Sequence, residues 1–374
     1  MAATPVVTFF EERLPQSEIK SLIVAKYLTS WGKIMATRHG RETSKIAYID
    51  LFAGPGRYRD GNDSTPLLII KRALLVPELR QNLVTVFNDA NPDSCAALEQ
   101  SIRALPGFDT LAYQPIVVNR TVDDEVAASF QRIRMIPSLV FLDPWGYKGV
   151  SLDLIDSTIK DWGCECVFFF NYRRLNPAID NPVFANHVDA FFGADTAQQL
   201  RRIGDRLGPR RREELILDAL KAALRRTYGQ YVMAFCFKAA GGVRTNHYLV
   251  HVTKNVLGYV IMKQIMAELS SYKVDGVPSF EFVPGRQIQP ILEAPLQKLI
   301  DELRLRFAGR SASVRQVYEQ HNIDTPYILP NYKDALRALE SQDLIDIDPP
   351  VGKRPTRGGV VTLKDQAVVT FPRR

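Results

Sequence analysis

Cysteine is scarce in this chain of 374 residues, and long apolar runs are missing from it. Its four cysteines, Cys95, Cys164, Cys166 and Cys236, lack the paired spacing of a metal site, so we interpret them as reduced core thiols. No stretch approaches the roughly 18 apolar residues of a membrane span. The first residues lack the charged and apolar parts of a secretion signal. We therefore expect a cytoplasmic protein with no metal and no membrane segment.

Several catalytic patterns are missing as well. The chain has no P-loop and no serine–histidine–aspartate arrangement, and its histidines lack metal-ligand spacing. The composition is otherwise that of an ordinary globular protein, with 46% hydrophobic and 24% charged residues. The 48 Lys and Arg residues exceed the 41 acidic residues, and a net charge of +7 favours an anionic partner.

A glycine-rich turn follows an apolar strand early in the chain. The strand ends at Asp50, Phe52 follows it, and Gly54 and Gly56 let the backbone fold back and approach a ligand closely. A strand that enters such a turn ahead of a helix builds the nucleotide pocket of doubly wound α/β proteins. A dinucleotide dehydrogenase would need a third glycine where this chain has Arg59.

Strand and helix patterns alternate five times between residues 46 and 171, after an amphipathic helix expected over residues 17–38. Helices and loops follow over residues 173–228. Two strand patterns joined by a turn at Gly241-Gly242 then indicate a β-hairpin.

The pattern Asp-x-Phe-x-Gly-x-Gly resembles motif I of class I S-adenosyl-L-methionine (SAM) methyltransferases, which also end in such a hairpin. The resemblance implies an α/β, Rossmann-like domain whose seven-stranded sheet has an antiparallel last strand, with SAM as the cofactor. In this family a carboxylate at the position of Asp50 receives the methionine ammonium of SAM. Phe52, Gly54 and Gly56 would bind the same end of the cofactor.

Two polar residues end the next two strands. Asp89 is placed to accept both ribose hydroxyls, although it could instead cap the following helix. Asn119 lies where a polar side chain usually meets the adenine amine, and Asp123 or Asp124 could take that role instead.

A second motif, Asp143-Pro144-Trp145-Gly146-Tyr147, follows the fourth strand. Amino-methyltransferases carry an (Asp/Asn)-Pro-Pro-aromatic motif there, and the version in this chain is similar to that of tRNA guanine-N2 methyltransferases. Asp143 and the Pro144 carbonyl would accept the hydrogens of an exocyclic base amine and draw its lone pair out of the ring plane. Trp145 and Tyr147 would stack on the base. The departure from the family pattern leaves the base open, and the alternative is an Asp-Pro turn with a core tryptophan.

Residues 15–270 together resemble the three-Cys-motif partner family, a group of methyltransferase-like proteins. The resemblance rests on Trp31, on the two motifs, and on a strand at residues 246–250 that is followed by a helix. It suggests a three-Cys-motif protein as a partner, and this family often ends in a winged-helix module.

The pattern changes past residue 290 to three helices and a β-hairpin with a basic tip. We expect a winged-helix domain over residues 291–374, after a methyltransferase domain over residues 1–290. Lys353, Arg354 and Arg357 at the tip are candidates for phosphate contacts. The alternative is a winged helix that docks protein or forms a dimer.

Arginine is concentrated in the inserted helices, at Arg210, Arg211 and Arg212. These side chains either follow a phosphate backbone or form a solvated helix face paired with nearby acids. We expect a SAM-dependent methyltransferase that acts on an exocyclic base amine in DNA or RNA. The alternatives are a small-molecule or protein methyltransferase, and a non-catalytic nucleic-acid-binding protein that keeps the fold.

Overall fold

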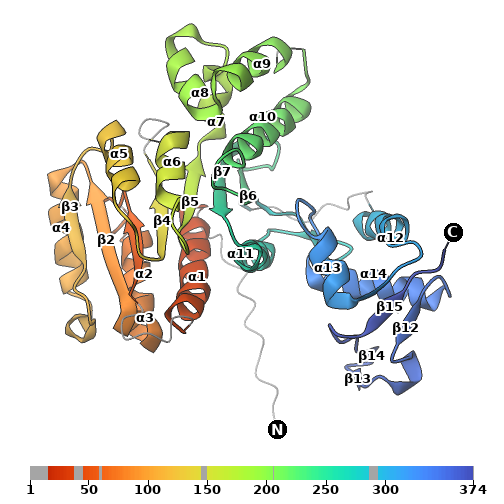
Figure 1. Ribbon diagram of the computed structural model, residues 1–374. Coiled ribbons are helices and arrows are strands. Elements are labelled where there is room, and N and C mark those ends of the chain that lie inside the picture. Colours follow the sequence, from red (N-terminus) through yellow and green to blue (C-terminus); the bar gives the residue numbers. More distant parts are fainter. Residues whose placement is uncertain are drawn as a thin grey trace. The chain divides into compact units, whose positions relative to one another are not determined.

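A computed structural model of the protein describes residues 16–37, 45–58, 61–144, 150–204, 206–285 and 294–373 (Figure 1). The chain divides into two compact units. The first comprises Met1–Ile265 and Phe282–Arg286, and the second comprises Met266–Glu281 and Gln287–Arg374. Among the described helices, none is both long and apolar enough to cross a membrane.

The first unit is built on an eight-stranded sheet with the order β10-β6-β7-β5-β4-β1-β2-β3. β7 pairs antiparallel with β5 and with β6, which confirms the expected class I methyltransferase arrangement. The two-residue strand β10 adds one strand to the expected seven. The strands are β1 (Ile46–Asp50), β2 (Leu83–Asp89), β3 (Ile116–Asn119), β4 (Ser138–Leu142), β5 (Glu165–Phe170), β6 (Tyr231–Lys238), β7 (Thr245–Thr253) and β10 (Glu281–Phe282).

The strand order reverses at β1, which pairs parallel with β2 on one side and with β4 on the other. Ligands of open α/β sheets bind beyond the carboxyl ends of the strands at such a reversal. Asp50 ends β1 opposite Phe141 of β4, and Asp143 follows β4 directly. The two carboxylates therefore leave neighbouring strands at the same edge of the sheet.

Helices cover both faces of the central strands, whereas the edge strand β3 is largely exposed. β4 is buried at every position, as expected for a strand with helices on either side. α1 packs against α2 and α3 and buries Val24, Tyr27 and Leu28 completely. The helices are α1 (Gln16–Thr37), α2 (Thr65–Leu75), α3 (Pro77–Asn82), α4 (Pro92–Arg103), α5 (Asp124–Arg132), α6 (Leu152–Ile159) and α11 (Val256–Glu268).

The chain leaves the sheet after β5 and forms four helices that Figure 1 shows beyond the strands. Their apolar side chains Val188, Phe192 and Leu220 are fully buried and join the same core as Leu154 and Phe168. The insertion is therefore an integral part of this unit. Its helices are α7 (Tyr172–Ala178), α8 (Ala185–Phe192), α9 (Ala194–Gly204) and α10 (Pro209–Leu224).

The second unit contains a three-stranded sheet of order β11-β15-β12, packed on three helices, and a separate β13–β14 hairpin. Helix, strand, two helices, strand, hairpin and strand follow one another in the order of a winged helix. Leu299, Val317 and Leu336 are fully buried between the helices. The elements are β8 (Lys273–Val274), β9 (Val277–Pro278), α12 (Pro295–Arg306), β11 (Ser311–Ser313), α13 (Val314–His321), α14 (Leu329–Ser341), β12 (Asp346–Asp348), β13 (Thr356–Arg357), β14 (Val360–Val361) and β15 (Val368–Thr370).

The four cysteines are all buried and unbonded to one another. Burial raises the pKa of the Cys166 thiol to about 12, so this thiol stays protonated at neutral pH. Within the described ranges, no three His, Cys, Asp or Glu side chains come together to hold a metal ion.

Candidate active site

A cavity of about 440 Å³ lies at the carboxyl ends of β1 and β4. Its volume falls within the roughly 300–1,000 Å³ of small-molecule sites. α1, the glycine-rich turn, the segment after β4 and the end of β5 supply its walls. The polar and aromatic side chains that line it are Lys20, Asp50, Phe52, Arg57, Tyr58, Ser64, Thr65, Phe141, Asp143, Phe169, Asn171 and Arg174.

Asp50 forms the floor of this cavity, where its side chain is almost completely buried. One carboxylate oxygen accepts a hydrogen bond from the backbone N–H of Phe52 at 3.1 Å. Burial raises the pKa of Asp50 to about 8, against the opposing effects of that N–H and of Lys20. A cationic group next to Asp50 would favour its ionised form.

The glycine turn depends on backbone conformations that other residues rarely adopt. Gly54 has a φ of 66°, and its N–H donates to the Asp89 carboxylate at 2.9 Å. Gly56 has a φ of 85°, and a Cβ there would lie 2.8 Å from Cδ1 of Leu98. A side chain at either position would strain the backbone, and one at Gly56 would also require Leu98 to shift.

The ends of β2 and β3 are tied together through Asp89 and Asn119. Asp89 also accepts from the N–H of Asn91 at 2.8 Å, and Asn91, rather than Asp89, caps α4. The Asn119 amide donates to the Asp89 carbonyl at 2.9 Å, so this side chain helps to hold the end of β3 beside β2. Asp123 caps α5 by accepting from the N–H of Val126 at 3.2 Å.

Asp143 lies at the rim of the cavity and forms an ion pair with Lys20 of α1. Lys20 is 11% exposed, and its ammonium lies 5.1 Å from the centre of the Phe169 ring. Burial alone would lower the pKa of Lys20, but Asp143, Tyr58 and Asp50 together raise it, so this side chain stays charged.

Sequence reasoning missed Lys20 as a site residue. The available signal was its position on the stripe of α1 that continues through the buried Val24, Tyr27 and Trp31. A cation on such an apolar stripe requires a buried acid nearby. Pro144 also borders the cavity, whereas Trp145 and Tyr147 lie outside the described residues.

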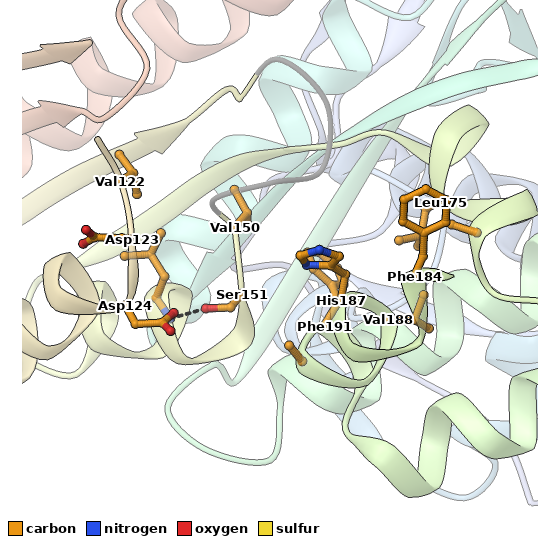
Figure 2. Close-up of a pocket in the computed structure, with 13 residues that line it drawn as sticks. Val122, Asp123, Asp124, Val150, Ser151, Leu175, Phe184, His187, Val188 and Phe191 are labelled. Carbon is orange, nitrogen blue, oxygen red and sulfur yellow. Dashed lines mark hydrogen bonds between the residues drawn. The ribbon is translucent and has the colours of Figure 1, made fainter. Parts of the chain in front are cut away.

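A second cavity, of about 230 Å³, lies between residues of the α/β core and residues of the inserted helices (Figure 2). Asp123, Asp124 and Ser151 line one side of it, and His187 and Phe184 line the other. Asp123 and Asp124 thus border a hollow, whereas Asn119, the other candidate for the adenine amine, lines neither cavity.

The basic candidates of the insertion differ in their surroundings. Arg210 and Arg211 are highly exposed and contact only Glu214 among the described residues, at 3.3 and 3.0 Å. Arg212 is 12% exposed, and its guanidinium bonds to Asp180 and to the Asn176 side chain, the latter at 2.7 Å. Arg212 therefore joins α10 to the end of α7.

Of the three cations of the wing that were candidates for phosphate contacts, Arg354 is already paired within the domain. Its side chain is 3% exposed and forms a two-pronged ion pair with Glu340 of α14. Lys353 and Arg357 are exposed. On α14 itself, Lys333 and Arg337 pair with Asp365 and Asp334 at 2.7 and 2.6 Å.

Residues 271–352 match the family model of the GMT-like wHTH domain. The second unit therefore contains a winged helix-turn-helix domain. No curated protein matches the chain in sequence.

Among solved structures, a protein of Legionella pneumophila is 11% identical, with a TM-score of 0.40, and the alignment covers 68% of this chain and 92% of that one. A SAM-dependent methyltransferase of Agrobacterium tumefaciens is 9% identical, with a TM-score of 0.35 and coverages of 63% and 62%. The precorrin-6y C5,15-methyltransferase of Geobacter metallireducens is 13% identical, with a TM-score of 0.30 and coverages of 66% and 92%. The strand order, rather than these distant matches, defines the fold.

Proposed function

We propose that the protein is a SAM-dependent methyltransferase that transfers a methyl group to an exocyclic base amine in nucleic acid. The observation that carries this proposal is the pairing of two carboxylates, Asp50 and Asp143, at the ends of neighbouring strands and around one cavity. One is buried beside a glycine turn and suits a ligand ammonium. The other carboxylate, Asp143, lies at the rim of the cavity, where the amine that accepts the methyl group can reach it.

Asp50, Phe52 and Gly54 line the cavity and fit the methionine end of SAM, whereas Gly56, Asp89 and Asn119 lie outside its lining. Asp50 would accept the methionine ammonium, with Phe52, Gly54 and Gly56 around it, and Asp89 would accept the ribose hydroxyls through the lone pairs that its backbone donors leave free. Asn119 would meet the adenine amine. Asp123 and Asp124 are the alternative acceptors, and the hollow that they border shares no lining residue with the cavity at Asp50.

Bound SAM supplies a methyl group on a sulfonium for direct transfer. The task of the protein is to orient the acceptor amine toward it. Asp143 and the Pro144 carbonyl would accept the amine hydrogens, which makes the nitrogen lone pair available for attack. Trp145 and Tyr147 would hold the base by stacking.

The winged helix-turn-helix domain and the exposed cations support a nucleic-acid substrate. Lys353 and Arg357 on the wing are exposed, and Arg210 and Arg211 on α10, although paired with Glu214, are far more exposed than the paired cations of α14. We further propose membership of the three-Cys-motif partner family, with a three-Cys-motif protein as a partner.

Two measurements test this function. Calorimetry should show SAM binding that Asp50→Ala largely removes, because the charged partner of the ammonium is lost. Transfer of tritiated methyl groups should then label total RNA or DNA rather than protein or small metabolites. Equal SAM binding by the wild type and by the double variant Asp50→Ala/Gly56→Val would contradict the cofactor site. SAM binding without any transfer would indicate a non-catalytic protein.

A further inference from the structure

The acceptor carboxylate Asp143 is held from one side only. Lys20 bonds to its oxygen Oδ2. No hydrogen bond or ion pair reaches the other oxygen, Oδ1, from any residue that the structure describes, and Asp143 is 22% exposed at the cavity rim. Within the described part of the chain, Oδ2 is therefore paired, whereas Oδ1 is available to a hydrogen-bond donor.

We propose that Lys20 is the positioning residue of the acceptor site, holding Oδ2 of Asp143 so that Oδ1 faces the incoming amine. This inference rests on the proposed function and deepens it by adding α1 to the catalytic arrangement. A carboxylate on the short segment after β4 could otherwise rotate. The cation restrains that rotation before any acceptor arrives.

The position of Lys20 is itself strongly constrained. Its ammonium lies over the ring of Phe169, and that ring lies 4.3 Å from the ring of His247. The His247 ring in turn stacks on Phe237 at 4.6 Å. Burial lowers the pKa of His247 to about 3, with a contribution from Lys20, so this imidazole stays neutral and does not compete for Asp143. The wall behind Lys20 is thus aromatic and uncharged.

The charges around Lys20 also link the two carboxylates. Asp143 raises the pKa of Asp50 and Lys20 lowers it, so Lys20 favours the ionised form of the cofactor carboxylate as well. Lys20 therefore affects both carboxylates: it forms an ion pair with Asp143 and lowers the pKa of Asp50. The titratable groups that face Lys20 are Asp50 of β1, Tyr58 after the glycine turn, Asp143 after β4 and His247 of β7. Two further cations, Arg57 and Arg174, line the same cavity.

Lys20→Met is the decisive variant, with Lys20→Arg as the conservative one. Because Asp143 loses its restraint, we expect Lys20→Met to lower kcat for methyl transfer to RNA or DNA on the order of 10²-fold. Lys20→Arg should recover much of this loss because it keeps a cation there. Lys33→Met, an exposed lysine of the same helix, is the matched control and should transfer normally.

The pH dependence of SAM binding separates positioning from a merely structural role. SAM affinity should rise with pH until Asp50 is fully ionised and should then reach a plateau. Lys20→Met should move the pH at which this plateau begins to a higher value. The double variant Lys20→Met/Asp143→Asn loses both the cation that lowers the pKa of Asp50 and the carboxylate that raises it. The pH at which the plateau begins should therefore return toward that of the wild type. It also leaves no unpaired buried charge, so it serves if the single variant folds poorly.

The outcomes are distinguishable. A wild type that binds no SAM overturns the proposed function and this inference with it. A wild type that binds SAM and transfers methyl groups, beside a Lys20→Met variant with unchanged kcat and an unchanged plateau, overturns the inference alone.

Discussion

Tyr27 of α1 donates its hydroxyl hydrogen to the carboxylate of Glu165, the first residue of β5. The same oxygen lies 2.8 Å from Nε2 of His251 on β7. All three side chains are buried. Tyr27 lies seven residues, or two turns, after Lys20 on one face of α1, so this bond fixes the helix that supplies Lys20 to the cavity.

Tyr27→Phe removes the hydroxyl donor and leaves a buried carboxylate oxygen with one partner fewer. We expect the free energy of unfolding to fall by about 1–3 kcal/mol, measured by urea denaturation at pH 7. Tyr228→Phe, at a position that is 42% exposed, is the control and should change it by less than about 0.5 kcal/mol. An unchanged midpoint for Tyr27→Phe would mean that the bond from Tyr27 to Glu165 does not help to hold α1 in place.

SAM affinity should depend on pH through Asp50. The buried carboxyl keeps its proton up to about pH 8, and a cationic ligand requires it ionised, so binding below pH 8 releases a proton. The dissociation constant should therefore fall by up to about tenfold from pH 7 to pH 8 and then level off. Asp50→Asn should bind weakly and without this dependence. Calorimetry in buffers of different ionisation heat would count the released proton.

The same carboxyl makes the ligand-free fold sensitive to pH. An unfolded Asp loses its proton near its ordinary value of 3.8, whereas the folded protein keeps it to about pH 8. The folded state thus binds more protons between these values, and its stability falls as pH rises through this window. Asp50→Asn should abolish that loss, so thermal unfolding of the variant should change less between pH 5 and pH 8 than that of the wild type.

Asp143→Ala should abolish methyl transfer, because no carboxylate remains to accept an amine hydrogen. The change also leaves Lys20 buried without its partner, beside the place where a sulfonium would bind. SAM affinity should therefore fall more in Asp143→Ala than in Asp143→Ala/Lys20→Met, where both charges are removed. Near-normal turnover of Asp143→Ala would exclude its role in activating the amine.

The wing should bind phosphates through Lys353 and Arg357. Replacing both by Ala should lower nucleic-acid affinity and flatten its salt dependence on duplex DNA, by up to about 0.9 in the log–log slope for each phosphate that is no longer neutralised. Lys298→Ala, at an exposed lysine of α12, is the control. Arg354→Ala should instead destabilise the domain, since it leaves Glu340 unpaired. An unaltered slope for the double variant would favour a winged helix that docks protein.

The sequence was sufficient to predict seven of the eight strands of the sheet, because these strands are apolar and most are separated by helices, whereas the two-residue strand β10 has no such signal. Asp50 and Asp143 were located correctly at the ends of β1 and β4 for that reason. β7 was recognised from the hairpin, and its antiparallel pairing with β5 is confirmed. The periodicity of apolar residues depends only on residues that are close together in the sequence, and it is therefore sufficient to predict single strands and helices.

Pairings between distant segments could not be predicted in the same way. Lys20 and Asp143 are 123 residues apart, and their pairing depends on how α1 crosses the sheet. Arg354 looked free because its neighbours in the chain are basic or neutral, while its partner Glu340 belongs to the preceding helix. Charge runs in a sequence show where cations are, and only the fold shows which of them are already neutralised.

The Arg354–Glu340 pair stabilises the shape of the wing, whereas other residues carry the charge on its surface. A buried two-pronged bond between α14 and the base of the wing holds the hairpin at its root, while Lys353 and Arg357 are exposed. Residues at the tip can therefore be exchanged without unfolding the domain. Variants of this wing with altered tips could be selected for new targets, provided that the root pair is retained.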